Sequence, residues 1–215
     1  MTERLRRQFA PVLVIVLTAG LAACGGPVYK PFNPIDETRP IRAASIAVIS
    51  GSHRDGDVKL AEFVTKQLAE RTTFRVLSQE EIAKRAPGYP SVIRIKNKEE
   101  IKEDDERVVW FVPSDKAKLD ALQARLKVDY LYVVWIPRMT VVSGGNSGTT
   151  YYVFPAGNMI AYPGGRVVAS TRMVEGSSAS LLALFRPKDY YILDAIQISS
   201  KAIVDEMIDV TKSKK

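Results

Sequence analysis

The chain has a single cysteine, Cys24, which directly follows a mainly apolar run over residues 9–23. Residues 1–8 carry three arginines, so the N-terminus has the order of a secretory signal: a basic start, an apolar stretch and small residues at its end. The run is shorter than the roughly 20 apolar residues that a transmembrane helix needs. We therefore predict that residues 1–23 are a signal peptide that is removed on export.

The composition excludes several classes of protein. One cysteine and one histidine cannot build a disulfide framework or a conventional His/Cys metal site. Hydrophobic residues make up 46% and charged residues 26%, as in chains that fold. The formal net charge of +7 is modest and there is no Arg-rich or aromatic-interleaved basic motif, so nucleic acid is not an expected partner.

The residues before the cysteine, Leu21-Ala22-Ala23-Cys24, resemble the lipobox of bacterial lipoproteins. This resemblance implies cleavage between Ala23 and Cys24, a diacylglycerol on the Cys24 thiol and an N-acyl chain on its amino group. Buried acyl chains stabilise membrane attachment by roughly 0.8 kcal/mol per methylene, so two or three of them anchor a protein firmly. We expect Cys24 to be an anchor and not a nucleophile, with no other cofactor. The alternative is an ordinary signal peptide with an incidental cysteine.

Glycines follow the cysteine at Gly25 and Gly26, whereas an aspartate directly after this cysteine commonly retains Gram-negative lipoproteins in the inner membrane. The resemblance therefore implies the periplasmic face of the outer membrane. Residues 24–42 contain four prolines and little hydrophobic periodicity, which predicts a semi-extended tether. At about 3.1 Å per residue, residues 25–42 would reach roughly 55 Å. Residues 43–215 are expected to form a single periplasmic domain.

Short apolar runs rich in β-branched residues predict strands over residues 44–50, 73–77, 108–112 and 130–136. The run 130–136 is the most strand-like, and we expect a central strand that Pro137 stops. The charged run 97–107 is expected to be a solvated excursion. Further β-rich pieces at 138–142, 149–154 and 166–174 are separated by turn-forming sequences at 143–148, 155–158 and 163–165, which predicts antiparallel hairpins.

Four segments with helical periodicity or capping sequences alternate with these strands. The first helix follows Asp55–Asp57 and ends at Arg71, and the second is a short helix from the capping box Ser78–Glu81 to Pro87. The third is capped by Pro113–Ser114 and has an apolar stripe of Leu119, Leu122 and Leu126. The fourth is a long helix from Asp189, and the residues on its core face are Leu193, Ile196, Ser200, Ile203, Val204 and Met207. The predicted fold class is α/β (α+β): a mixed β-sheet packed by amphipathic helices, with a β-hairpin region and a long C-terminal helix.

This order of elements on a lipidated chain resembles the bacterial lipoprotein superfamily that includes the curli-secretion protein CsgG, the penicillin-binding-protein activator LpoB and the N-terminal domain of TolB. The residues that carry the resemblance are Ser45–Ile49, Leu60–Leu68, Phe74–Ser78 and Lys127–Leu131. None of them is a catalytic motif. The resemblance implies a scaffold that acts in envelope assembly or regulation through protein contacts.

Three segments suggest chemistry, and each has a simpler interpretation. The loop Gly51–Asp57 follows a strand and contains His53, but it lacks phosphate-loop spacing and reads as a turn with capping aspartates. The acidic residues of 99–106 are interleaved with lysines and lack calcium-loop spacing. The glycine-rich run 143–148 reads as a hairpin tip. We therefore predict no catalytic residue, no metal site and no small-molecule substrate.

Contact residues are expected near the hairpin tip. Tyr151 and Tyr152 are neighbours on a strand, so their rings point to opposite faces and one of them lies outside. An exposed ring near a polar loop is typical of protein contact sites. We predict contacts through Tyr151, Tyr152 and Asn146.

The sequence thus predicts a non-enzymatic lipoprotein whose partners are the membrane, through its lipid, and an envelope protein or further copies of the same chain. One alternative is a self-assembling secretion pore subunit like CsgG. It needs alternating strands of about ten residues, and the pieces 149–154 and 166–174 are short. A second alternative is a periplasmic hydrolase whose site no motif reveals.

Overall fold

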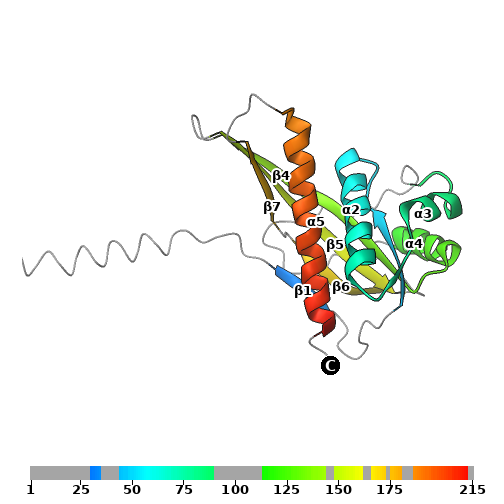
Figure 1. Cartoon of the computed structure of the whole chain (residues 1–215). Helices are drawn as coiled ribbons and strands as arrows, with labels where there is room; N and C mark the ends of the chain where they lie inside the picture. The colour runs from blue at the N-terminus through cyan, green and yellow to red at the C-terminus, as the bar shows by residue number, and fades with distance from the viewer. Residues whose placement is uncertain are drawn as a thin grey trace, which may run out of the picture.

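The computed structural model describes residues 30–34, 44–89, 113–143, 148–161, 166–172, 175–180 and 186–212. Within these ranges one β-sheet lies between two layers of helices (Figure 1). The predicted signal peptide over residues 1–23, Cys24, Asn146 and the predicted segments 97–107 and 108–112 lie outside the described residues.

The strands are β1 (Lys30–Pro34), β2 (Ser45–Ser50), β3 (Arg75–Val76), β4 (Tyr130–Ser143), β5 (Thr149–Ala161), β6 (Arg166–Arg172) and β7 (Gly176–Ser180). The helices are α2 (Asp55–Arg71), α3 (Gln79–Arg85), α4 (Pro113–Leu126) and α5 (Lys188–Lys212). The strand order is β1-β6-β5-β4-β2-β3, with β7 paired to β5. The pairs of β2 with β3 and with β4 are parallel and the others antiparallel, which confirms the predicted mixed sheet.

The sheet is buried on both faces where β2 and β4 cross its middle. On β2, Ile46 and Val48 pack under α2 and α5, while Ala47 and Ile49 belong to the core under α3 and α4. This arrangement explains why the strand reads as a continuous apolar run and not as an alternating one. The predicted central position of the strand that begins at Tyr130 is confirmed.

The predicted capping box is present at α3, where Ser78 and Glu81 bond each other's backbone N–H. The helix α4 begins on Pro113 itself, because a proline fits the first helical position, and not after a cap at Ser114. On α5 the predicted core face is buried except at Leu193, which is 40% exposed. The prediction that Leu193 belongs to the core face of the helix was therefore wrong.

Two predicted strand ends were wrong for the same reason. Pro137 does not stop β4, which continues to Ser143, and the sequence around Pro155 is no turn but lies inside β5. The register of the two strands shifts between Trp135 and Arg138, which makes a bulge there. A bulge leaves ladder positions unpaired, so prolines, which have no N–H, are tolerated at it.

β1 corrects the predicted tether. Lys30–Pro34 lies within residues 24–42, yet it pairs with β6 and forms the outermost strand on that side of the sheet. Two of its five residues are prolines, which suits an edge strand because one of its sides needs no hydrogen-bond donors. The residues before Lys30 are therefore the only part of the predicted tether between Cys24 and the sheet.

Asp129 joins the starts of β2 and β4. Its carboxylate accepts hydrogen bonds from the N–H of Ser45 at 2.8 Å and from the Ser45 hydroxyl at 2.6 Å, and these bonds lower the pKa of Asp129 from its ordinary value of 3.8. A carboxylate whose folded-state pKa is lowered stabilises the fold above its unfolded pKa. That stability is lost as the pH falls through the folded-state pKa.

We expect Asp129→Asn to lower the free energy of unfolding near neutral pH by about 1 kcal/mol, a small value because the carboxylate is exposed. Urea unfolding of both proteins across the acidic range measures this difference, which should shrink as Asp129 becomes protonated. Glu70→Gln, at an exposed ion pair on α2, is the control and should change little. An Asp129→Asn loss of the same size at every pH would refute the role of the charge.

Candidate interaction surface

The carboxylate of Asp57 holds the bulge of β4 in place. Asp57 is buried in the first turn of α2 and accepts a hydrogen bond from the N–H of Ile136 at 2.8 Å. Arg54 forms an ion pair with Asp57 at 3.1 Å and donates to the carbonyl of Ile136 at 3.0 Å. The Ser52 hydroxyl also donates to Asp57. Both backbone groups of Ile136 are thus bonded to side chains from the start of α2.

Three strands continue past this bulge as what we call the extension: Arg138–Ser143 of β4, Thr149–Phe154 of β5, and β7. β2 pairs with β4 only as far as Val134, so the extension lies outside the parallel part of the sheet (Figure 1). The bulge also exchanges the faces of β4, because Met139 pairs with Val153, which packs under α5. Odd-numbered residues of β4 therefore face α5 in the extension.

On one face of the extension the helix α5 covers β5 and β7, while Met139 and Val141 of β4 stay exposed on that side. The ring of Tyr151 stacks on that of Tyr191, with centroids 5.9 Å apart and planes within 7°. The Ser178 hydroxyl donates to the carboxylate of Asp194 at 2.7 Å. Contacts from two strands thus fix the N-terminal half of α5 on the extension.

We call the opposite side the open face of the extension. By register it carries Arg138, Thr140 and Val142 of β4, Thr150, Tyr152 and Phe154 of β5, and Ser177 and Ala179 of β7. Among the described residues, the core on this side of the sheet contains no residue of the extension and ends at Trp135 on β4 and Ala156 on β5. Arg138, Val142, Ser177 and Ala179 of this face are exposed, and its other four side chains are half-buried.

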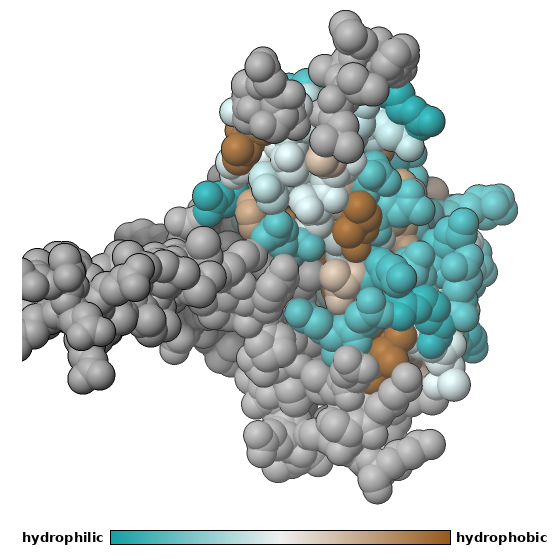
Figure 2. All heavy atoms as spheres, turned by 60° about the vertical axis from the view of Figure 1, so that its left-hand side comes forward, coloured by the Kyte–Doolittle hydropathy of each residue, from teal (hydrophilic) through white to brown (hydrophobic). Residues whose placement is uncertain are grey.

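Aromatic rings and a cation gather on the open face. The rings of Tyr152 and Phe154 stack with centroids 6.5 Å apart, and the Arg138 guanidinium lies 5.3 Å from the Phe154 centroid. Next to them Val142 is 50% exposed. Tyrosine, phenylalanine and arginine are the residue types enriched in protein interfaces. Figure 2 shows that the described surface on the side turned forward there is hydrophilic over much of its area, with separate hydrophobic patches.

The structure separates the predicted contact residues. Tyr151 is buried at 9% exposure against α5, while Tyr152 is half-buried on the open face, and the contacts predicted for both tyrosines stay predictions. Ala23, Cys24 and Asn146 lie outside the described residues. Arg138 and Phe154 were not predicted as contact residues from the sequence. Phe154 follows Tyr152 by two residues, and that spacing puts both rings on one face of a strand.

The loop before α2 does not assemble a site for chemistry. Ser52 and Asp57 are buried and bonded to each other, while His53 and Asp55 are exposed. In the part of the chain that the structure describes, no three His, Cys, Asp or Glu residues come together as metal ligands. No helix in that part is long and apolar enough to cross a membrane.

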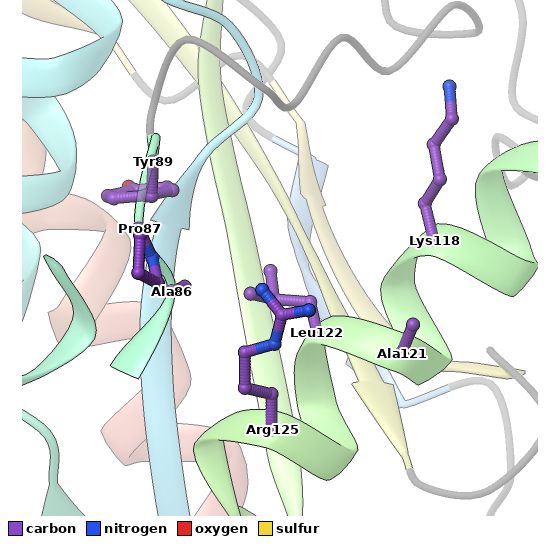
Figure 3. Close-up of a pocket in the computed structure, with 7 residues that line it drawn as sticks. All are labelled: Ala86, Pro87, Tyr89, Lys118, Ala121, Leu122 and Arg125. Carbon is purple, nitrogen blue, oxygen red and sulfur yellow. The ribbon is translucent and has the colours of Figure 1, made fainter. Parts of the chain in front are cut away.

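A pocket of about 230 Å³ lies between the turn after α3 and the helix α4. Its lining residues are Ala86, Pro87, Tyr89, Lys118, Ala121, Leu122 and Arg125 (Figure 3). The Tyr89 hydroxyl accepts the N–H of Ser50 at 2.6 Å, and burial raises its pKa to about 12, so it stays protonated. The volume is below the 300–1,000 Å³ that is common for ligand sites. The pocket is therefore a weaker candidate than the open face.

Neither a family model nor a curated protein sequence matches the chain. Solved structures do match. They include a PelC dodecamer from Paraburkholderia phytofirmans (8% identity, 83% of this chain and 98% of that chain covered, TM-score 0.43) and the lipoprotein GNA1162 from Neisseria meningitidis (11%, 77% and 99%, TM-score 0.44). A third is the hypothetical protein CT253 from Chlamydia trachomatis (9%, 80% and 100%, TM-score 0.44). With TM-scores below 0.5 these likenesses carry no functional argument, and the resemblance to CsgG, LpoB and TolB stays a prediction from the sequence.

Proposed function

We propose that the protein is a lipoprotein of the cell envelope, held by acylated Cys24 at the periplasmic face of the outer membrane. Its domain acts without catalysis, by binding another envelope protein or further copies of the same chain. The observation that supports this function best is the open face, where Tyr152, Phe154 and Arg138 lie together on a sheet surface that no described helix covers.

The open face is suited to binding because packing contacts hold its base and the back of β5 and β7. The Asp57 contacts fix the bulge at its base, and the stacked rings of Tyr151 and Tyr191 fix α5 against its back. Binding to a preorganised surface costs less conformational entropy than binding that must first order a loop. Large aromatic side chains then provide contact area with few rotatable bonds.

A secretion pore subunit is the second candidate function. The strands β4 and β5 have 14 and 13 residues, so they are longer than the pieces predicted from the sequence. Only six residue pairs of the two strands lie beyond the bulge, whereas a strand that crosses a membrane needs about 9–11 residues. The length of the extension therefore favours a contact surface over a pore wall.

A hydrolase is the third candidate function. A catalytic serine needs a base within hydrogen-bond reach and access to substrate. The hydroxyl of Ser52 is buried and donates to Asp57, which itself holds the backbone of Ile136. This geometry favours a structural role for the serine and the aspartate.

We expect a photoreactive p-benzoylphenylalanine in place of Tyr152 to cross-link the protein to one defined partner in cells. We expect this cross-link because the ring of Tyr152 lies on the open face, next to Phe154 and Arg138. The cross-linked product is formed by irradiation of the cells, and its mass is then measured. A product of twice the chain mass identifies a second copy, and any other discrete product identifies an envelope protein.

The matched control places the same photoreactive residue at Ala69, which is exposed on α2. Tyr152→Ala should weaken binding of the identified partner about tenfold or more, as truncation of an interface aromatic commonly does, and should leave the far-ultraviolet dichroism unchanged. Equal cross-linking at both positions, or none at Tyr152, would show that the open face is not the contact surface.

A further inference from the structure

The strand β4 has an unpaired edge beyond its bulge. β2 pairs with β4 only as far as Val134, whose carbonyl oxygen bonds the chain just after β2. Residues two apart on a strand turn their backbone groups to the same side, so Ile136 presents its groups to this edge too, where Arg54 and Asp57 bond them. Over residues 139–143, within the part of the chain that the structure describes, β4 pairs only with β5 on its other side.

We call the unpaired side of residues 139–143 the outer edge. An unpaired edge presents backbone N–H and C=O groups in a row, so the partner that fits it is another extended strand. Proteins commonly protect such edges with lysines or prolines. The outer edge has the sequence Met-Thr-Val-Val-Ser, with neither. Its backbone is therefore able to bond a further strand.

Apolar side chains next to the outer edge are exposed on the side of α5. Met139 is 42% and Val141 45% exposed. A Cβ placed at Gly56, in the first turn of α2, would lie 3.7 Å from Ile196 of α5, and the two helices run in the same direction (Figure 1). Leu193 is one helical turn before Ile196, ahead of the start of α2, and is 40% exposed. Apolar side chains thus continue on this side beyond the cover of α2.

The residue pattern of the outer edge fits an antiparallel copy of itself. When Thr140 lies opposite Thr140 of a second copy, Met139 of each copy lies opposite Val141 of the other. The exposed apolar side chains then cover each other, and threonines that face each other are favourable cross-strand neighbours. Arg138, the nearest charge, lies opposite Val142, so no like charges meet.

We propose that two copies of the protein pair along the outer edge, in antiparallel orientation about a two-fold axis between their Thr140 residues. The two sheets then form one continuous sheet. Opposite residues of an antiparallel pair point to the same face, so the open faces of both copies lie on one side of this sheet. The contact needs no lipid and is separate from the open face, so the inference goes beyond the proposed function.

Disulfide cross-linking tests this pairing. Thr140→Cys is introduced into the full-length protein, and cells that produce it are oxidised with copper–phenanthroline. Opposite residues of antiparallel strands have Cα atoms about 4.5–5.5 Å apart, within the range that a disulfide spans. We expect a product of twice the chain mass, linked through position 140 of both copies, in a yield about tenfold or more above the control. Mass spectrometry identifies the linked peptides.

Thr150→Cys is the matched control. Thr150 is also half-buried on the open face, but it lies inside the sheet, between Val142 of β4 and Ala179 of β7. It should give no product linked through position 150. The unmodified protein is oxidised in parallel, because a product linked through Cys24 there reveals an unacylated thiol. That result would contradict the proposed function and leave the pairing of the outer edge unaffected.

The register is tested with Met139→Cys and Val141→Cys. Copies of one variant should link poorly, because positions 139 and 139 are diagonal neighbours, about 7–8 Å apart, and a disulfide rarely spans more than about 7 Å. Cells that produce both variants should give a product that links position 139 to position 141. A product linked through position 139 of both copies would contradict this register.

A charge on the edge tests the role of its apolar residues. Val141→Lys, added to Thr140→Cys, should lower the yield of linked product about tenfold or more, because lysines on exposed edges oppose strand pairing. Ile198→Lys replaces an exposed apolar residue of α5 and should leave the yield unchanged. Equal yields at positions 140 and 150, no product at position 140, or a product with another protein would overturn the inference. Circular dichroism checks that each variant is folded.

Discussion

Asp57→Ala is expected to lower the free energy of unfolding by about 3 kcal/mol. The change removes the acceptor for the N–H of Ile136 and for the Ser52 hydroxyl, and it removes the ion pair of Arg54, which keeps its bond to the carbonyl of Ile136. Ser52 and Ile136 are buried, so water cannot replace the bonds that they lose, whereas the Arg54 side chain is exposed and regains water. Urea unfolding monitored by circular dichroism measures the difference.

Two further variants separate the charge from the hydrogen bond. Asp57→Asn keeps an oxygen for Ile136 and loses the ion pair with Arg54, so we expect about half of the loss. Asp55→Ala, at an exposed position in the same helical turn, should cost less than about 1 kcal/mol. If Asp57→Ala were no more harmful than Asp55→Ala, the role of Asp57 at the bulge would be wrong.

Gly176→Ala is expected to destabilise the protein by about 3 kcal/mol and to loosen β7 from α5. A Cβ at Gly176 would come within 2.7 Å of the backbone nitrogen of Ser199 and into contact with the carbonyl oxygen of Ala195. These are backbone atoms inside a helix, so they cannot move aside as a flexible side chain does. Thermal unfolding and hydrogen exchange of the β7 amides measure the two effects.

Gly56→Ala is the matched control, because it adds the same methyl group where there is room. The nearest atoms are side-chain carbons of Ile136 and Ile196 at 3.5 and 3.7 Å, which is ordinary contact distance. Alanine favours the helix by up to about 1 kcal/mol over glycine, so this variant should be neutral or more stable. A similar loss in both variants would contradict the close approach of β7 and α5.

Local sequence signals predicted most elements of the core because they act over a few residues. The capping box of Ser78–Glu81 and the apolar run that became β2 were each enough to place an element. The same signals failed at Pro137 and Pro155, which normally mark strand ends. Their place in a continuous strand depends on a bulge whose backbone is bonded by a residue far away in the sequence, Asp57.

The candidate surface was predictable only in part for a related reason. Adjacent tyrosines required one ring on each face of a strand, and the structure confirms this separation. Which ring lies inside depends on where α5 packs, and Tyr191 of that helix is 40 residues from Tyr151. The edge strand β1 was missed because its prolines and short length resemble a tether, and only its pairing with β6 reveals it.

The most direct test of the lipoprotein account is the mass of the mature chain isolated from membranes. We predict a chain that begins at Cys24 and carries the added mass of a diacylglycerol and an N-acyl group, and a Cys24→Ser variant without either modification that stays folded. A mature chain that begins at another residue, or one with an unmodified Cys24 thiol, would contradict the account.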